Sequence, residues 1–238
     1  MKTENVFERV EKKFLLTREQ AEVLKADLDG FGFEKLDFGS PDISSVYWDS
    51  PDEILVRRSL ERPVYKEKLR MRAYGTVQMD DTVYMEIKKK YRGVVYKRRV
   101  PIRLSDMAQV EKEGCMPDGC GQIGREITAM IRRYNLAPKT LIMCRREAYV
   151  LPGGEGIRLT MDTGIRYRRR ILDVTCAQTG QLILSGDPVL LEVKIPGIWP
   201  QWLLRELEGL NVRGTHLSKV GLAYQLSRCT RKEEHASA

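Results

Sequence analysis

The chain has 238 residues, which is enough to bury a substantial core without disulfide or metal cross-links. Its 42% hydrophobic and 31% charged residues exclude a disordered, collagen-like or coiled-coil protein. Lys and Arg number 41 against 33 Asp and Glu, a net charge of +8. This charge favours an anionic partner, which could be nucleic acid, a phosphate-rich small molecule or an acidic membrane face.

Targeting and redox signals are scarce in the sequence. No apolar run is long enough to span a bilayer, and the first residues, 1–5, lead into charged sequence without a signal-peptide core. Five scattered cysteines and two histidines favour reduced thiols over a disulfide framework or a zinc site. We therefore expect a cytoplasmic protein without a membrane span of its own. The sequence leaves open both docking to a membrane protein and the oligomeric state.

Strand and helix patterns follow one another irregularly along the chain. A strand is expected over 6–16, followed by a helix over 17–30 that Thr17 caps and Gly30 ends. Further strands are expected over 43–49, 64–74, 82–91, 94–104, 140–151, 156–168 and 188–195, and helices over about 105–113, 122–135, 201–209 and 216–229. No repeat or linker divides the chain. We expect one antiparallel α+β domain over 1–238, with its core at about 6–228 and a frayed tail over 231–238.

Ionisable residues recur at every second position within the expected strands. A period of two places them on one face of each strand, and the opposite face is apolar, as with Leu69, Met71 and Ile87. The residues on the charged side are Glu11 and Lys13; Lys68, Arg70 and Arg72; Glu86, Lys88 and Lys90; Lys97 and Arg99; Arg146; Arg158 and Asp162; and Glu192 and Lys194.

Seven charged strands need an explanation beyond a solvated sheet surface. Cross-strand ion pairs on an exposed face would explain any single strand. A closed barrel with this face inside explains all of them, because a lumen rich in Arg and Lys is favourable only around a polyanion. The Arg fork suits phosphate oxygens, and the few carboxylates suit a hard divalent cation that bridges phosphates.

Seven short motifs follow one another over about residues 6–228. They are Glu11-Lys12-Lys13-Phe14, Lys68-Leu69-Arg70-Met71-Arg72, Glu86-Ile87-Lys88, Arg146-Glu147-Ala148-Tyr149, Arg158-Leu159-Thr160-Met161-Asp162, Leu191-Glu192-Val193-Lys194 and Leu217-Ser218-Lys219. In this order they resemble the VTC domain, the polyphosphate polymerase branch of the triphosphate tunnel metalloenzymes (CYTH-like superfamily). The resemblance implies an α+β fold with a closed eight-stranded antiparallel β tunnel and helices packed outside. It also implies an enzyme that transfers the γ-phosphate of ATP onto a growing polyphosphate chain, with Mn²⁺ or Mg²⁺ bound.

The resemblance assigns roles to particular residues. Catalytic roles fall on Arg70, Arg72, Lys88, Glu192 and Lys219. Binding of ATP, triphosphate and polyphosphate falls on Lys13, Lys68, Arg70, Arg72, Lys88, Lys97, Arg99, Arg146, Arg158, Lys194, His216 and Lys219. The metal is expected at Glu192, with Glu11 and Glu86 as further candidate ligands. His216 stands where the family often has another basic residue, three positions before Lys219.

Other functions remain open at this point. A hydrolase of tripolyphosphate or nucleoside triphosphates would use the same tunnel, and a catalytically idle polyphosphate-binding subunit is compatible with His216. Nucleic-acid binding is disfavoured, because the basic residues alternate with apolar ones toward an inferred lumen. We interpret the basic run 166–170 as a hairpin that steers anions, and Gly119-x-Gly121-x-x-Gly124 as a turn, because no strand precedes it.

Overall fold

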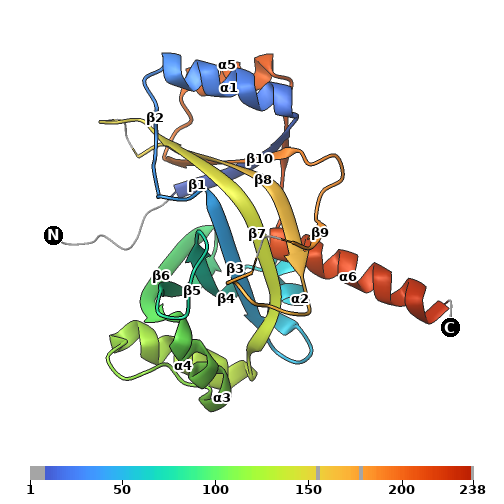
Figure 1. The fold of residues 1–238 in the computed structure, drawn as a ribbon. Helices are drawn as coiled ribbons and strands as arrows, with labels where there is room; N and C mark the ends of the chain where they lie inside the picture. Colours follow the sequence, from blue (N-terminus) through green and yellow to red (C-terminus); the bar gives the residue numbers. More distant parts are fainter. Residues whose placement is uncertain (1–8, 154–155, 177–178, 237–238) are drawn as a thin grey trace.

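A continuous antiparallel sheet with helices around it forms the body of the molecule (Figure 1). The computed structural model describes residues 9–153, 156–176 and 179–236. Within them the strands follow the order β11-β1-β10-β8-β7-β3-β4-β5-β6, with β2 beside β7 and β9 beside β8. Strands that are distant in sequence therefore lie side by side, notably β1 and β10.

Eight of the strands are long. They are β1 (Arg9–Leu16), β3 (Asp42–Asp49), β4 (Tyr65–Tyr74), β5 (Thr82–Tyr91), β6 (Val94–Arg103), β7 (Ala137–Val150), β8 (Arg158–Arg168) and β10 (Val189–Pro196). Each corresponds to a strand expected from the sequence, although residues 6–8 of the first expected strand lie outside the described residues. The short strands β2 (Glu34–Lys35), β9 (Gln181–Leu182) and β11 (Arg213–Thr215) were not expected, since so few residues show no period.

The helices begin and end close to the expected positions, with two differences. They are α1 (Arg18–Gly30), α2 (Ile54–Leu60), α3 (Met107–Glu113), α4 (Gly121–Tyr134), α5 (Gln201–Gly209) and α6 (Lys219–Ala236). Thr17 caps α1 in a capping box with Gln20, as the sequence predicts. Helix α2 was not expected, and α6 continues through residue 236 into the segment expected to fray. In the described part of the chain, no helix has both the length and the apolar character to cross a membrane.

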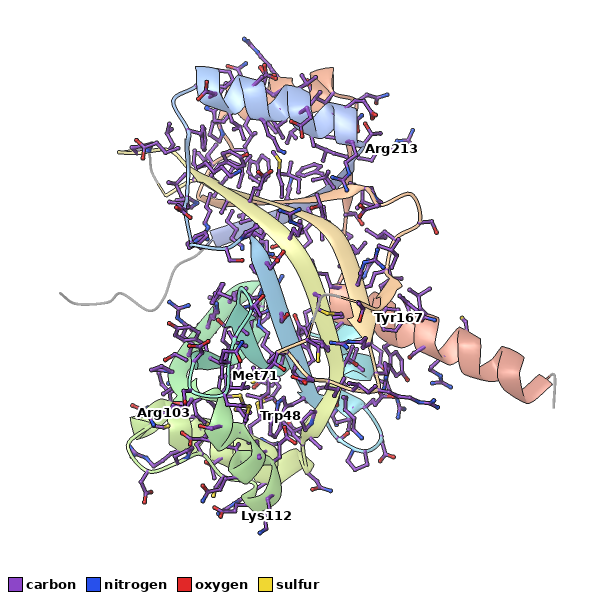
Figure 2. The ribbon with its side chains drawn as sticks, viewed as in Figure 1. Trp48, Met71, Arg103, Lys112, Tyr167 and Arg213 are labelled. Atoms are coloured by element: carbon purple, nitrogen blue, oxygen red, sulfur yellow. The ribbon has the colours of Figure 1, made fainter. Side chains whose placement is uncertain are left out.

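Two pairs of helices cover the apolar face of the sheet, at opposite ends of the molecule (Figure 1). Helices α3 and α4 cover β3–β6, and Trp48 and Met71 lie in this layer (Figure 2). Helices α1 and α5 lie together over β1, β8 and β10, where Leu24 and Leu203 are fully buried. Each such aliphatic side chain contributes about 1.5–3 kcal/mol by its burial. These four helices pack on the face opposite the charged residues, as expected, although the closed lumen itself is not seen.

Helix α6 differs, because its first half packs against the charged face of the sheet. Leu190 lies two residues from Glu192 and so shares its face. Leu190, Ile142 and Tyr167 form an apolar cluster with Ala223 of α6. The second half of α6 projects away from the sheet (Figure 1). The expectation that every helix packs outside is therefore wrong for α6, because this end of the charged face carries apolar residues that need a cover.

The sheet does not close through main-chain hydrogen bonds. Its path ends at β11 and β6, and no pairing joins these two among the described residues. On the edge of β1 away from β10, β11 pairs with Lys13–Leu15 only, and β6 does not pair with the remainder of that edge. A side-chain contact spans the gap, since Lys88 Nζ on β5 lies 3.5 Å from Glu11 Oε2 on β1. The expected closed eight-stranded tunnel is replaced by an eleven-stranded sheet with two free ends.

Candidate functional site

The predicted site residues converge on one face of the sheet, which we call the charged face. Residues directly opposite one another in an antiparallel pair share a face. Lys13 lies opposite Glu192. Arg70 lies opposite Glu86. The same register argument extends across β6 and β8, so seven strands contribute to one surface.

One group of charges surrounds Glu192 on β10. We call it the Glu192 cluster: Glu11, Lys13, Arg146, Asp162, Glu192, Lys194 and Lys219. The Glu192 carboxylate lies 3.0 Å from Lys219 Nζ and 3.4 Å from Lys13 Nζ, with Arg146 and Lys194 each 3.7 Å away. Burial opposes its ionisation, but these cations hold the pKa of Glu192 well below its ordinary value. Glu192 is therefore a carboxylate in contact with four cations.

Asp162 on β8 is the most deeply buried acid of the cluster, with a side chain that is 0% exposed. Arg146 donates to it twice, from Nε to Oδ1 at 2.5 Å and from Nη2 to Oδ2 at 2.6 Å. Lys219 Nζ lies 2.5 Å from Oδ2, so one lysine of α6 bridges Asp162 and Glu192. Burial disfavours the charge of Lys219, but the two carboxylates raise its pKa. The site predicted from the sequence omitted Asp162, although its spacing from Arg158 already placed it on this face.

A second group surrounds Glu86 on β5. We call it the Glu86 cluster: Tyr47, Arg70, Arg72, Glu86 and Lys97. Arg70 Nε donates to Glu86 Oε2 at 2.7 Å, and Lys97 Nζ lies 2.7 Å from Oε1. Burial would raise the pKa of Glu86, but Arg70, Lys97 and Arg72 lower it to about 2. Burial lowers the pKa of Lys97 to about 8 despite the neighbouring carboxylate.

Tyr47 on β3 is a member of this site that sequence reasoning missed. Its hydroxyl accepts a hydrogen bond from Arg70 Nη1 at 3.0 Å, and the Arg70 guanidinium lies 5.7 Å from the centre of its ring. Burial would raise the pKa of Tyr47, but Arg70, Lys68 and Arg72 lower it to about 7. The middle of β3 carries no charged residue, so the charge pattern gave no signal. Ser45 Oγ accepts a hydrogen bond from Arg72 Nε, and Tyr47 lies two residues further along β3 and so on the same face. A search for polar residues at every second position could have located Tyr47.

The segment that leads into α6 is held against the charged face by two lysines. Lys13 Nζ donates to the carbonyl oxygen of Leu217 at 3.0 Å, and Lys68 Nζ donates to Ser218 Oγ at 3.0 Å. Ser218 Oγ also accepts from the Gly221 N–H at 3.3 Å, within the first turn of α6. The Leu217-Ser218-Lys219 motif therefore lies at the site, as expected.

Two further predicted residues, Arg99 and Arg158, lie opposite Glu86 and Lys194 and beside aromatic rings. The Arg99 guanidinium lies 4.7 Å from the centre of the Tyr84 ring, and the Arg158 guanidinium 5.6 Å from that of Phe38. In the described part of the chain no hydrogen bond or ion pair is seen for His216, and its assigned role in substrate binding stays a prediction.

The three predicted metal ligands do not form one group. Glu86 belongs to one cluster and Glu11 and Glu192 to the other, and the described residues contain no set of three His, Cys, Asp or Glu arranged around a metal position. However, Thr160 lies directly opposite Glu192, and its buried Oγ1 has no hydrogen-bond partner among the described residues. Glu192, Thr160 and Glu11 thus provide oxygen ligands of the kind that Mg²⁺ and Mn²⁺ prefer.

A surface cavity of about 410 Å³ lies elsewhere on the sheet. Asp42, Ser44, Arg145, Arg166 and Cys176 are among the residues that line it. Neither cluster contributes a residue to this cavity, so the candidate site is defined by its charges and not by this cavity.

Comparison with known proteins identifies the family. The family model described as the VTC domain matches residues 8–227, and the chain therefore belongs to the VTC domain family. The chain is 28% identical over 162 residues to vacuolar transporter chaperone complex subunit 4 of Trypanosoma brucei brucei, and equally to the protein of that name from Trypanosoma cruzi. Each match covers 54% of this chain and 20% of the relative. The match thus spans about a fifth of these relatives.

Two solved structures have a similar course of the chain at low sequence identity. One is a Vibrio parahaemolyticus protein proposed to be an adenylate cyclase, with a TM-score of 0.49, 15% identity, and coverage of 92% of this chain and 98% of that one. The other is the PH1819 protein of Pyrococcus horikoshii, with a TM-score of 0.48, 14% identity, and coverage of 93% and 98%.

Proposed function

We propose that this chain is a polyphosphate polymerase that transfers the γ-phosphate of ATP onto a growing polyphosphate chain. The observation that carries this proposal is the excess of basic groups around the buried carboxylates Glu86, Asp162 and Glu192 on one face. In the reaction, a terminal phosphate oxygen of the polyphosphate attacks the γ-phosphorus, the bond from that phosphorus to the β–γ bridging oxygen breaks, and ADP leaves.

The chain's own residues would position the phosphates and neutralise their charge, which is most of what phosphoryl transfer requires. Arg70 and Arg72 place guanidinium groups at the site from β4, and Arg146 places one from β7, each already held by a neighbouring polar group. Their charge and their further N–H groups suit phosphate oxygens. Lys88 and Lys219 supply point charges from β5 and α6. The carboxylates keep these cations in place before the phosphates arrive, so little rearrangement is needed on binding.

A divalent cation would bind with the phosphates at Glu192, with Thr160 and Glu11 beside it. When bound, Mn²⁺ or Mg²⁺ would neutralise charge on the phosphate oxygens during transfer. Glu86 is less suited to this role, because Arg70 and Lys97 lie 2.7 Å from its two oxygens, whereas the cations beside Glu192 Oε2 lie 3.7 Å away.

The protonation of the acids favours a phosphate acceptor over water. A terminal phosphate is largely ionised at neutral pH and needs no base, whereas attack by water is assisted by a general base. Neighbouring cations lower the pKa of Glu11, Glu86, Asp162 and Glu192, which makes these carboxylates weak bases. This observation supports the polymerase over a hydrolase that relies on a carboxylate base, and Tyr47, whose pKa is about 7, is the group at the site that could serve a hydrolase as base.

Product analysis tests the proposal. The purified protein is incubated with ATP and Mn²⁺ or Mg²⁺, and the products are separated on a gel that resolves anionic polymers. We expect long polyphosphate and ADP, strongly reduced in Arg70→Ala and unchanged in Lys112→Ala. Free phosphate as the sole product would indicate a hydrolase, and binding without turnover an idle subunit. Tighter binding to single-stranded DNA than to polyphosphate of equal charge would overturn the proposal.

Membership of a larger assembly is part of the same proposal. The two Trypanosoma relatives are named as subunits of a chaperone complex and are much longer than the region matched here. In such an assembly, on its cytoplasmic side, this chain would contribute the part that handles phosphate.

A further inference from the structure

We infer that a bound phosphate chain extends from the reacting site in one direction, over a row of four lysines on β4 and β5. We call this row the lysine track: Lys66, Lys68, Lys88 and Lys90. The inference rests on the proposed function and adds to it a binding site for phosphates beyond those that react. Lys66 and Lys90 are its outer pair, and neither is part of the two clusters described above.

The cross-strand register brings like charges together on the track. Lys66 lies directly opposite Lys90, and Lys68 directly opposite Lys88. Like charges in directly opposite positions destabilise a sheet, because the two side chains are neighbours on one face. On the far side of β5, Lys88 also lies opposite Lys97 of β6. Such an arrangement is favourable only when an anion lies over it.

Few acids compensate the track from the surrounding elements. Lys88 has Glu11 of β1 at 3.5 Å, and Lys68 is bonded to Ser218. No carboxylate of the described residues lies within 4.0 Å of Lys66 or Lys90. The mutual repulsion is reflected in the pKa of Lys66, which burial and the nearby Lys90 and Lys88 lower. Burial, Lys88 and Lys13 likewise lower the pKa of Lys68 to about 8.

The direction follows from what lies at each end of the charged face. At the end beyond Asp162, the first half of α6 covers apolar residues that include Leu190 and Tyr167. A polyanion gains nothing there and would lose its hydration. In the opposite direction along β4, charged residues continue at every second position, about 6.8 Å apart, from Arg72 to Lys66. The track ends beside Tyr65 and Tyr91, which are both 45% exposed, so the bound polyphosphate reaches solvent at this end.

Binding measurements on charge-matched variants test the inference. The affinities of triphosphate and of a linear polyphosphate of about fifty phosphates are measured for the wild type and for Lys66→Ala/Lys90→Ala. The control is Lys89→Ala/Lys112→Ala, which removes the same charge. Lys89 alternates onto the other face of β5, and Lys112 projects from α3 at the far end of the molecule (Figure 2). We expect the track variant to bind the long chain about tenfold more weakly, with a smaller salt dependence, and to bind triphosphate as the wild type does.

Three outcomes would contradict the track. They are an equal loss in the control, an equal loss of triphosphate affinity, and an unchanged affinity for the long chain. If the wild type bound neither ligand, the proposed function itself would fail, which is a distinguishable result. Folding is checked by thermal unfolding. Because the substitutions relieve repulsion between Lys66 and Lys90, Tm should stay the same or rise, and a fall in Tm would contradict the inferred repulsion.

Discussion

Arg146 on β7 and Asp162 on β8 form a bidentate ion pair in the interior of the site, with both hydrogen bonds at 2.5–2.6 Å. Removing one partner of such a buried pair costs about 3–5 kcal/mol, because the other charge is left without compensation. We expect Asp162→Asn to lower the free energy of unfolding by about this amount, since Arg146 and Lys219 both lose a counter-ion. Urea denaturation followed by tryptophan fluorescence measures the change.

Glu147 provides the matched control on the next residue of β7. It pairs with Lys25 and Lys35 near the surface, with a side chain that is 29% exposed. Glu147→Gln should therefore change the free energy of unfolding by less than about 1 kcal/mol. Equal effects of Asp162→Asn and Glu147→Gln would show that the buried pair does not hold β7 to β8.

Tyr47→Phe should remove a titration near neutral pH. Because the pKa of Tyr47 is lowered to about 7, its phenolate should form around that pH in the folded protein, and ultraviolet difference spectra detect it directly. The pKa of Tyr47 in the folded protein is lower than its ordinary value of 10.0, so ionisation of Tyr47 stabilises the fold. This stabilising contribution is complete above pH 10. This stabilisation is lost as the pH falls through about 7. A wild-type spectrum without a transition in this range would contradict the prediction.

Glu192→Gln should weaken metal-dependent turnover and, like Asp162→Asn, lower the free energy of unfolding, because four cations lose a shared counter-ion. Gln is nearly isosteric with Glu but carries no charge, so the site loses a ligand for Mn²⁺ without gaining a cavity. Titration with Mn²⁺ in the presence of triphosphate, read by calorimetry, measures metal affinity independently of activity. Glu86→Gln serves as the comparison, because both oxygens of Glu86 are engaged by cations. A loss of metal affinity in Glu86→Gln alone would place the metal in the other cluster.

Triphosphate binding should weaken as the pH rises above about 8. Burial lowers the pKa of Lys68, Lys97 and Lys194 to about 8, so these groups lose their charge above that pH. Bound phosphate favours the charged lysines, which moves the decline to somewhat higher pH in the complex. Affinities measured between pH 7 and 10 test this. An affinity that stays constant over the whole range would contradict it.

Local patterns were sufficient to predict the long strands and the residues on their charged face. Alternation placed Arg70 and Glu86 together, because a period of two fixes the face of every residue in a strand. The separation of Glu86 from Glu192 was out of reach, since it depends on the strand order between β5 and β10. The partner of Arg146 was similarly hidden, because a register shift near Met143 determines which residue of β8 it faces.

The resemblance already placed Lys219, the first residue of α6, at the site, but the apolar contacts of the rest of the helix could not be predicted. The sequence around Ala223 indicates a helix with an apolar side, but nothing in it specifies which face of the sheet that side will cover. Closure of the sheet could not be predicted either, because it depends on which strands pair with the edges of β1. Part of the edge of β1 pairs with β11, and the three residues of β11 are too few to be recognised as a strand.

The position of β1 between β10 and β11 determines when the site can form during synthesis. The pairs β4–β5 and β5–β6 join strands that are near in sequence, so the Glu86 cluster can assemble while the ribosome is still making the rest of the chain. Lys13 is synthesised early, whereas its neighbours in the site, Glu192 and Lys219, are synthesised much later. Until then β1 exposes unpaired edges, which makes the nascent protein prone to association with other chains. Of the described strands, β1 is made first and is among the last to be completed.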